Sequence, residues 1–113
     1  MLRSILFTLV LAGLATHASA QAPAGDGEKG ETVYAAQKCS ICHAISGKGN
    51  VKGPLDDVGS RLTAAEIRAW IKEPKTMTAK TKAPRKPEMR AYPNLPDDEL
   101  TDLVAYMLSL KKK

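Results

Sequence analysis

The most constraining feature of this chain is the run Cys39-Ser40-Ile41-Cys42-His43, which brings two thiols and one imidazole together. On a helical turn, positions i, i+3 and i+4 face the same way, so Cys39, Cys42 and His43 converge on one face. Both sulfurs can then form thioether bonds to the vinyl groups of one porphyrin, while the imidazole reaches the iron. This C-x-x-C-H pattern is the attachment signature of a c-type haem. It therefore predicts a fold organised around one covalently bound haem.

Other chemistries of a cysteine pair fit this sequence less well. A thioredoxin-like redox pair is expected next to alternating strands and helices, and the sequence has no such pattern. A disulfide between Cys39 and Cys42 would close a very small loop and so stabilise little. A structural zinc ion needs four ligands, whereas only three thiol or imidazole groups cluster here. Haem attachment is therefore the interpretation that the motif favours.

Residues 1–20 have the organisation of a cleaved secretory signal peptide. Arg3 gives a positive start, residues 5–14 form an apolar core, and Ala18-Ser19-Ala20 matches the A-x-A cleavage pattern. The apolar run is shorter than the roughly 20 residues that a membrane-spanning anchor needs. We therefore expect cleavage after Ala20, a flexible leader over residues 21–25 and one domain over residues 26–113. The expected location is the periplasm, where the mature chain would be soluble.

Loss of the signal has two consequences for the 113-residue chain. What remains is one small domain, which buries only about two-thirds of the surface of its unfolded chain. Aromatic residues make up only 4% of the sequence, so a covalently held porphyrin would supply missing core. The chain has two histidines, and because His17 lies in the signal, His43 is the one that stays. A second histidine of the same chain therefore cannot be the sixth iron ligand.

Three main helices are predicted. The first follows an N-cap at Asp26 and extends over about residues 28–38 into the cysteine motif. The second begins with the capping box Thr63-Ala64-Ala65-Glu66 and ends at Glu73, before Pro74. The third begins at or near Pro96 and has an acidic first turn. Its apolar positions form one stripe: Leu100, Leu103, Val104, Met107 and Leu108.

Two long loops connect these helices. Residues 46–60 are rich in glycine, and residues 74–96 are rich in proline and lysine without an apolar period. Loops as long as the second are usually functional in compact domains. No segment has a strand pattern. The predicted fold class is therefore all-α, with three main helices and two long loops wrapped around one haem.

Over residues 26–110 the chain resembles the small class I cytochromes c of the bacterial monohaem type. The resemblance implies the cytochrome c fold, in which the first and last helices cross closely at a glycine. It also implies a haem c that transfers single electrons. Besides the C-x-x-C-H motif, the residues that give the resemblance are Gly30, Tyr34, Gly53-Pro54-Leu55, Trp70, the run from Met89 to Pro96, Leu103 and Tyr106.

The same resemblance implies two roles near the iron. The carbonyl of Pro54 would accept a hydrogen bond from the ring of His43, and such a bond fixes the imidazole tautomer. Met89 would be the sixth ligand, and this methionine and histidine pair raises the reduction potential. The family usually has proline directly after that methionine, whereas this chain has Arg90. Met77, a lysine or an open site remain alternatives to Met89.

Three further residues have a possible role at the haem. In related proteins, side chains near the positions of Trp70 and Arg61 donate hydrogen bonds to a buried propionate. Core packing is the alternative for Trp70, and a solvated surface charge is the alternative for Arg61. Tyr92 would either pack against the haem or line the loop.

Positive charge is concentrated in residues 72–90, which we call the basic segment. This segment has only two acidic residues, Glu73 and Glu88. Around an exposed haem edge it would attract an acidic redox partner, although a solvated loop is the simpler explanation. Its basic residues are Lys72, Lys75, Lys80, Lys82, Arg85, Lys86 and Arg90.

The predicted function is that of a soluble periplasmic electron carrier with one haem c, and not of an enzyme. His43 and Met89 would be its axial ligands. Two other classes stay open. One is a haem sensor or peroxidase-like protein with a labile sixth site. The other is a dedicated electron-transfer subunit of a larger dehydrogenase or oxidase. Neither nucleic acid binding nor stable membrane insertion of the mature chain is expected.

Overall fold

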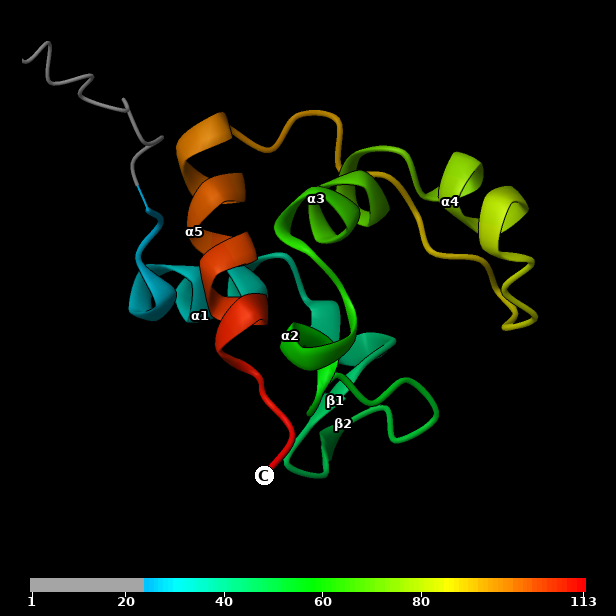
Figure 1. Ribbon diagram of the computed structural model, residues 1–113, viewed down its shortest axis with the longest axis horizontal. Helices are drawn as coiled ribbons and strands as arrows, with labels where there is room; N and C mark the ends of the chain where they lie inside the picture. The colour runs from blue at the N-terminus through cyan, green and yellow to red at the C-terminus, as the bar shows by residue number, and fades with distance from the viewer. Residues whose placement is uncertain (1–23) are drawn as a thin grey trace, which may run out of the picture.

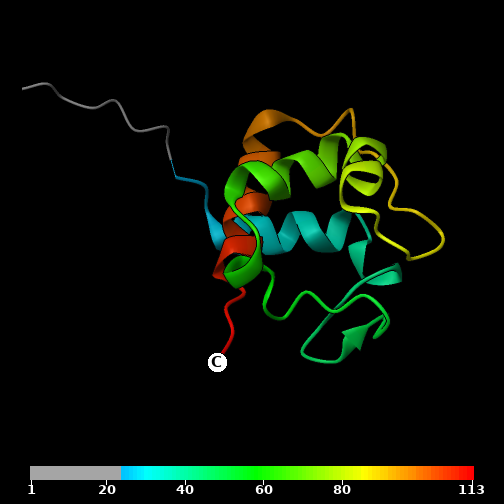
Figure 2. The same ribbon diagram turned by 45° about the vertical axis from the view of Figure 1, so that its right-hand side comes forward.

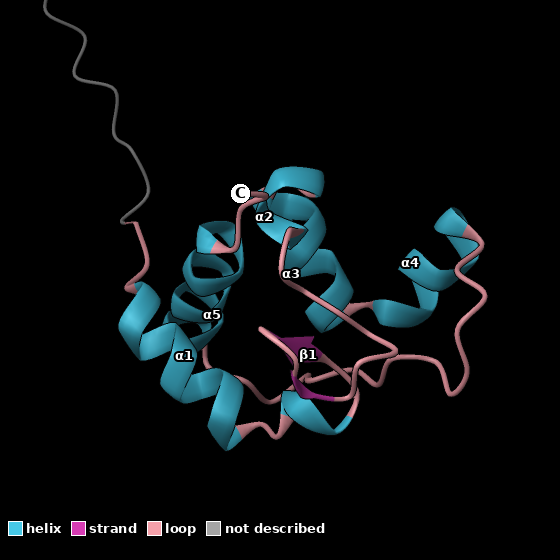
Figure 3. Cartoon of the chain, turned by 90° about the horizontal axis from the view of Figure 1, so that it is seen from below, coloured by secondary structure: helices cyan, strands magenta, loops and turns pink. Residues whose placement is uncertain are grey.

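A computed structural model describes residues 24–113, so the predicted signal peptide and most of the leader lie outside the described residues. The described chain is mainly helical, and Figure 1 shows its elements. Viewed from below, α1, α5, α2, α3 and β1 are arranged around a common centre (Figure 3). In chain order the elements are α1 (Gly27–Ala36), the 3₁₀ turn η1 (Cys39–Ile41), β1 (Ala44–Ile45), β2 (Lys48–Gly49), α2 (Val58–Arg61), α3 (Ala64–Lys72), α4 (Pro74–Thr81) and α5 (Asp97–Ser109).

Helices α1 and α5 cross at Gly30, as the resemblance implied. Figures 1 and 2 both show α1 running across α5. A Cβ atom on Gly30 would collide with the main-chain carbonyl of Asp102 and would lie 2.7 Å from the Cβ of Tyr106. Only a residue without a side chain allows this approach. Beside the crossing, the rings of Tyr34 and Tyr106 meet edge to face, with centroids 5.9 Å apart.

The starts of α1 and α3 confirm the predicted caps. Asp26 accepts hydrogen bonds from the main-chain N–H groups of the first turn of α1, at 2.9 and 3.2 Å. At α3, the Thr63 hydroxyl accepts from the Glu66 N–H at 3.2 Å. The Glu66 carboxylate in turn accepts from the Thr63 N–H at 2.8 Å, which completes the capping box.

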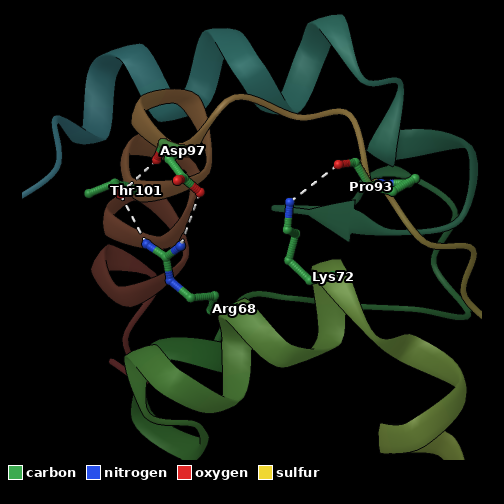
Figure 4. A network of polar contacts seen from close by, with 5 residues as sticks. All are labelled: Arg68, Lys72, Pro93, Asp97 and Thr101. Atoms are coloured by element: carbon green, nitrogen blue, oxygen red, sulfur yellow. Dashed lines mark hydrogen bonds and ion pairs between the residues drawn. The ribbon is translucent and has the colours of Figure 1, made fainter.

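The apolar stripe of α5 forms the centre of the hydrophobic core. Leu100 is fully buried, with 0% of its surface exposed, and Met107 lies in the same cluster, as expected. Arg68 of α3 donates to the Thr101 hydroxyl at 3.0 Å and pairs with Asp97 at 3.9 Å (Figure 4). These contacts join α3 to the beginning of α5. The other core residues are Val33, Val58, Ile67, Ile71, Leu95, Leu103 and Val104.

Helix α4 corrects the prediction of one unbroken loop over residues 74–96. Pro74 does end α3, as expected, but it is also the first residue of α4, where its missing N–H costs nothing. Within α4 only Pro74 and Met77 are buried. An apolar period therefore cannot form, and this stretch has no periodic pattern that would predict a helix. The remainder, residues 82–96, has no helix or strand.

The first loop also differs from the prediction. Its residues Lys48 and Gly49, which form β2, pair antiparallel with β1 directly before the loop, and the loop ends in the short helix α2. Strands of this length have too few residues for an alternating pattern. The fold nevertheless stays mainly helical, which confirms the predicted class. Within residues 24–113, no helix is long and apolar enough to cross a membrane.

Candidate haem-attachment site

The cysteine motif forms a tight turn directly after α1. Lys38 adopts a left-handed conformation, with φ of 57°, and turns the chain out of the helix axis. The carbonyl of Cys39 then accepts hydrogen bonds from the N–H groups of Cys42 at 3.1 Å and His43 at 2.9 Å. Cys39 is half-buried, Cys42 is exposed, and both are free thiols. The motif therefore has the one-turn conformation that its spacing predicts.

His43 is held by a main-chain carbonyl. Its Nδ1 lies 3.1 Å from the carbonyl oxygen of Gly53. Because a carbonyl oxygen can only accept, Nδ1 carries the hydrogen in this contact, and the lone pair stays on Nε2. Burial lowers the pKa of His43, which keeps the ring neutral. A neutral imidazole with a free Nε2 is the form that binds a metal ion.

The acceptor is Gly53 and not Pro54, so the prediction for the Pro54 carbonyl is wrong by one residue. The reason is the local pairing of the chain. Ala44 and Pro54 form an isolated parallel bridge, in which the Gly53 carbonyl accepts from the Ala44 N–H at 3.1 Å. Successive carbonyls of an extended chain point in opposite directions. The carbonyl that faces His43 is therefore the one before the proline.

The candidate sixth ligand, Met89, lies in the segment without regular structure between α4 and α5. Its side chain is half-buried and packs against the hydrophobic core. It also lines a cleft of about 440 Å³ between this segment and the junction of α3 and α4. The alternative, Met77, is buried on α4 with 8% of its surface exposed. The assignment of Met89 as ligand stays a prediction.

Trp70 and Arg61 have different surroundings. Trp70 is half-buried on α3, between the half-buried Ala69 and the buried Ile71. Arg61 is exposed and forms an ion pair with Asp57, in which Nε lies 2.9 Å from the carboxylate oxygen. Its guanidinium is therefore already paired, with the residue directly before α2. A contact of either side chain with a haem propionate stays a prediction.

Two arginines of the basic segment lie near the motif, which no pattern in the sequence predicts. A Cβ on Gly53 would collide with the guanidinium of Arg85, so Arg85 lies against Gly53. After burial, the positive charge of Arg85 is a second influence that lowers the pKa of His43. Burial raises the pKa of the Cys39 thiol, while the charge of Arg90 acts in the opposite direction. The basic segment thus folds back toward the attachment motif.

The residues present fit a covalently bound haem. Two free thiols and an imidazole with a free Nε2 are the groups that attachment requires. Between residues 24 and 113, the Tyr34 hydroxyl is the buried side-chain polar atom that lacks a hydrogen-bond partner. Burial, followed by the nearby Cys39, raises the pKa of Tyr34 to about 12. Buried polar atoms are normally hydrogen-bonded, so an unpaired hydroxyl near Cys39 is expected if a bound group, such as haem, completes the core there.

A metal site made of protein groups alone is not found in the described part of the chain. No group of three or more histidine, cysteine, aspartate or glutamate residues is close enough to hold an ion there.

Comparison with known proteins agrees with the fold and the site. The sequence pattern of the family described as Cytochrome c matches residues 27–111, and the chain belongs to this family. Membership of this family supports an electron-transfer haem protein, and it implies a covalently bound haem and redox partners.

A longer relative is cytochrome c oxidase subunit 2 of Alkalihalophilus pseudofirmus, which is 29% identical over 92 residues. The match covers 74% of this chain and 25% of the relative, so this chain spans about a quarter of that protein's length. No solved structure matches the chain significantly.

Proposed function

We propose that this protein is a soluble periplasmic carrier of single electrons, with one haem c attached through Cys39 and Cys42. Its axial ligands would be His43 and Met89. The observation that supports this most directly is the contact between His43 Nδ1 and the Gly53 carbonyl, because it presents Nε2 next to two free thiols. The periplasmic location rests on the signal peptide predicted in residues 1–20.

The residues of the turn have separate tasks. Cys39 and Cys42 would anchor the cofactor to η1, so that its position follows the main chain of the turn. The Gly53 carbonyl orients the His43 ring and increases its basicity as a ligand. When bound, the haem supplies an iron ion that gains or loses one electron without breaking a substrate bond.

Met89 is the better candidate for the opposite side of the iron. A thioether is a soft ligand and favours the reduced metal, which raises the reduction potential. Met89 lies in a segment with no helix or strand, so its main chain can adapt to a ligand position. Met77 is packed on a helix, and its rotation would disturb the buried face of α4. Met107 is part of the central core.

The basic segment would be the docking surface for an acidic redox partner. Of its cations, only Lys86 has an ion-pair partner among residues 24–113, namely Glu88 at 2.8 Å. The remaining positive charge is thus available to attract an acidic surface.

Charge reversal tests this docking surface. We expect Lys80→Glu to slow electron exchange with ferricyanide, an anionic reagent, and to speed exchange with hexaammineruthenium, a cationic one. Added salt should remove both effects. Lys29→Glu on α1 is the matched control, since this exposed lysine lies outside the segment. Equal effects of the two sites would contradict the docking assignment.

A second function is favoured by the oxidase relative. Because a quarter of an oxidase subunit resembles this chain, the protein could serve as a dedicated subunit that delivers electrons within a larger complex. Size-exclusion chromatography of a gently prepared periplasmic extract separates the two cases. A free carrier elutes as a small protein, whereas a dedicated subunit elutes with a large complex.

Carbon monoxide distinguishes the carrier from a sensor or peroxidase-like protein. Two protein ligands leave no free iron position, so we expect the ferrous protein to resist carbon monoxide on the timescale of mixing. Its absorption spectrum should then stay unchanged after carbon monoxide is added. Rapid conversion to the spectrum of a carbon monoxide complex would contradict the carrier proposal and favour an open or labile sixth site.

A further inference from the structure

The residue after Met89 makes two contacts with one aromatic side chain. Arg90 Nε donates a hydrogen bond to the Tyr92 hydroxyl at 3.2 Å. The Cζ atom of Arg90 lies 5.2 Å from the centroid of the same ring, within the range of a cation–π interaction. The guanidinium and the phenol thus close a small loop of side chains around Ala91. We call this pair of contacts the Arg90–Tyr92 clip.

Tyr92 is firmly attached to the body of the protein. Its main-chain N–H donates to the carbonyl of Ile71, a buried residue of α3, at 3.0 Å. Its ring packs against the hydrophobic core. Next along the chain, Lys72 reaches the Pro93 carbonyl with an Nζ to oxygen distance of 3.4 Å (Figure 4). The Arg90–Tyr92 clip therefore links the residue beside Met89 to an anchored position on α3.

The chain before Tyr92 has little other support. Residues 84–91 take part in no main-chain hydrogen bond among those found within residues 24–113. Each residue held in one conformation costs about 1–2 kcal/mol of entropy, so side-chain contacts must order this stretch. Proline after Met89 would restrict the chain by fixing φ, but this chain has Arg90 there.

We propose that Arg90 is a positioning residue, which holds Met89 toward the iron through its contacts with Tyr92. This inference rests on the proposed ligation by Met89. Without the clip, the segment samples conformations in which the thioether has left the iron. A small external ligand then competes for the vacated position, so its apparent affinity measures how often Met89 is displaced.

The test is imidazole binding to the oxidised, haem-loaded protein. We expect Arg90→Ala to bind imidazole about tenfold more tightly than the unchanged protein, which corresponds to about 1.4 kcal/mol. An exposed cation–π contact and one exposed hydrogen bond together reach this size. Tyr92→Phe keeps the ring and loses the hydrogen bond, so it should give a smaller increase of about threefold.

Two variants distinguish the effect of the Arg90–Tyr92 clip from the effect of positive charge alone. Arg90→Lys keeps the positive charge but loses the planar group that stacks on Tyr92 and donates to it, so it should resemble Arg90→Ala. Lys29→Ala removes an exposed cation on α1, outside the basic segment, and should leave the affinity unchanged. Wild-type affinity in Arg90→Lys, or equal gains in Lys29→Ala, would overturn the positioning role.

Met89→Ala distinguishes a wrong assignment of the positioning role to Arg90 from a wrong assignment of Met89 as the ligand. If Met89→Ala retains the near-infrared sulfur-to-iron band of the oxidised protein, Met89 is not the ligand and the inference is overturned with it. If that band is lost in Met89→Ala while Arg90→Ala binds imidazole with unchanged affinity, the ligation stands. The positioning role of Arg90 is then the part that is wrong.

Discussion

Gly30→Ala should damage the crossing of α1 and α5 more than the same substitution at Gly27, the other glycine of α1. The new Cβ would overlap the main-chain carbonyl of Asp102 and would lie 2.7 Å from the Cβ of Tyr106. Carbon atoms normally approach to about 3.5–4.0 Å, so the helices must separate by about 1 Å. The main-chain atoms of Asp102 cannot rotate away as the end of a side chain could.

Two opposing contributions determine how much Gly30→Ala changes the free energy of unfolding. Overpacking of this kind costs about 1–3 kcal/mol, and rigid main-chain neighbours favour the upper end. Alanine is better than glycine in a helix by about 0.5–1 kcal/mol, which partly offsets the loss. Gly27→Ala is the matched control, because its Cβ would meet only the Cα of Tyr106 at 4.0 Å. We expect the two variants to differ by about 2–3 kcal/mol in the free energy of unfolding.

Guanidinium denaturation of the two haem-loaded variants measures this difference, with far-UV circular dichroism as the signal. For a small domain the difference corresponds to midpoints about 0.5–1 M apart, with Gly30→Ala unfolding first. The absorption spectra should be the same in both folded variants, since neither glycine belongs to the attachment motif. Equal midpoints, or a more stable Gly30→Ala, would refute the close crossing as the reason for glycine at this position.

Three other substitutions test separate parts of the fold. Thr63→Ala removes the capping-box contacts with Glu66 and should cost about 1 kcal/mol in urea denaturation, so an unchanged midpoint would count against the cap. Leu100→Ala opens a cavity at a side chain with 0% exposure and should cost about 2–5 kcal/mol; a loss below 1 kcal/mol would contradict its central place in the core. The folded chain holds the phenol proton of Tyr34 more tightly than the unfolded chain does, since its pKa rises from 10.0 to about 12. Stability from this group is complete below pH 10 and declines as the pH rises toward 12, and Tyr34→Phe should weaken that decline in denaturation measured across this range.

Much of the fold was predictable because local signals and burial agree there. The capping box at Thr63 uses only neighbouring residues, so it forms as soon as the helix does. The stripe of α5 was visible because one face of a long helix is buried in the core. Helix α4 had no such signal, because only Pro74 and Met77 are buried and its other side chains are polar, small or charged.

The site was predictable only as far as its local motif extends. Cys39, Cys42 and His43 are close in the chain, so their spacing determines how they meet. The carbonyl that orients His43 belongs to a loop, and which carbonyl turns inward depends on the pairing of Ala44 with residues 53–55. The approach of Arg85 to Gly53 depends on the path of a segment far along the chain. Tertiary contacts of this kind leave no periodic signal in the sequence.

The proposed position of the iron between His43 and Met89 can be tested by comparing three proteins. The near-infrared absorption of the oxidised protein is measured for the unchanged chain, Met89→Ala and Met77→Ala. We expect a weak sulfur-to-iron band that is present in the unchanged chain and in Met77→Ala and lost in Met89→Ala. A band that survives in Met89→Ala and disappears in Met77→Ala would contradict ligation by Met89, as would the absence of this band from the unchanged protein.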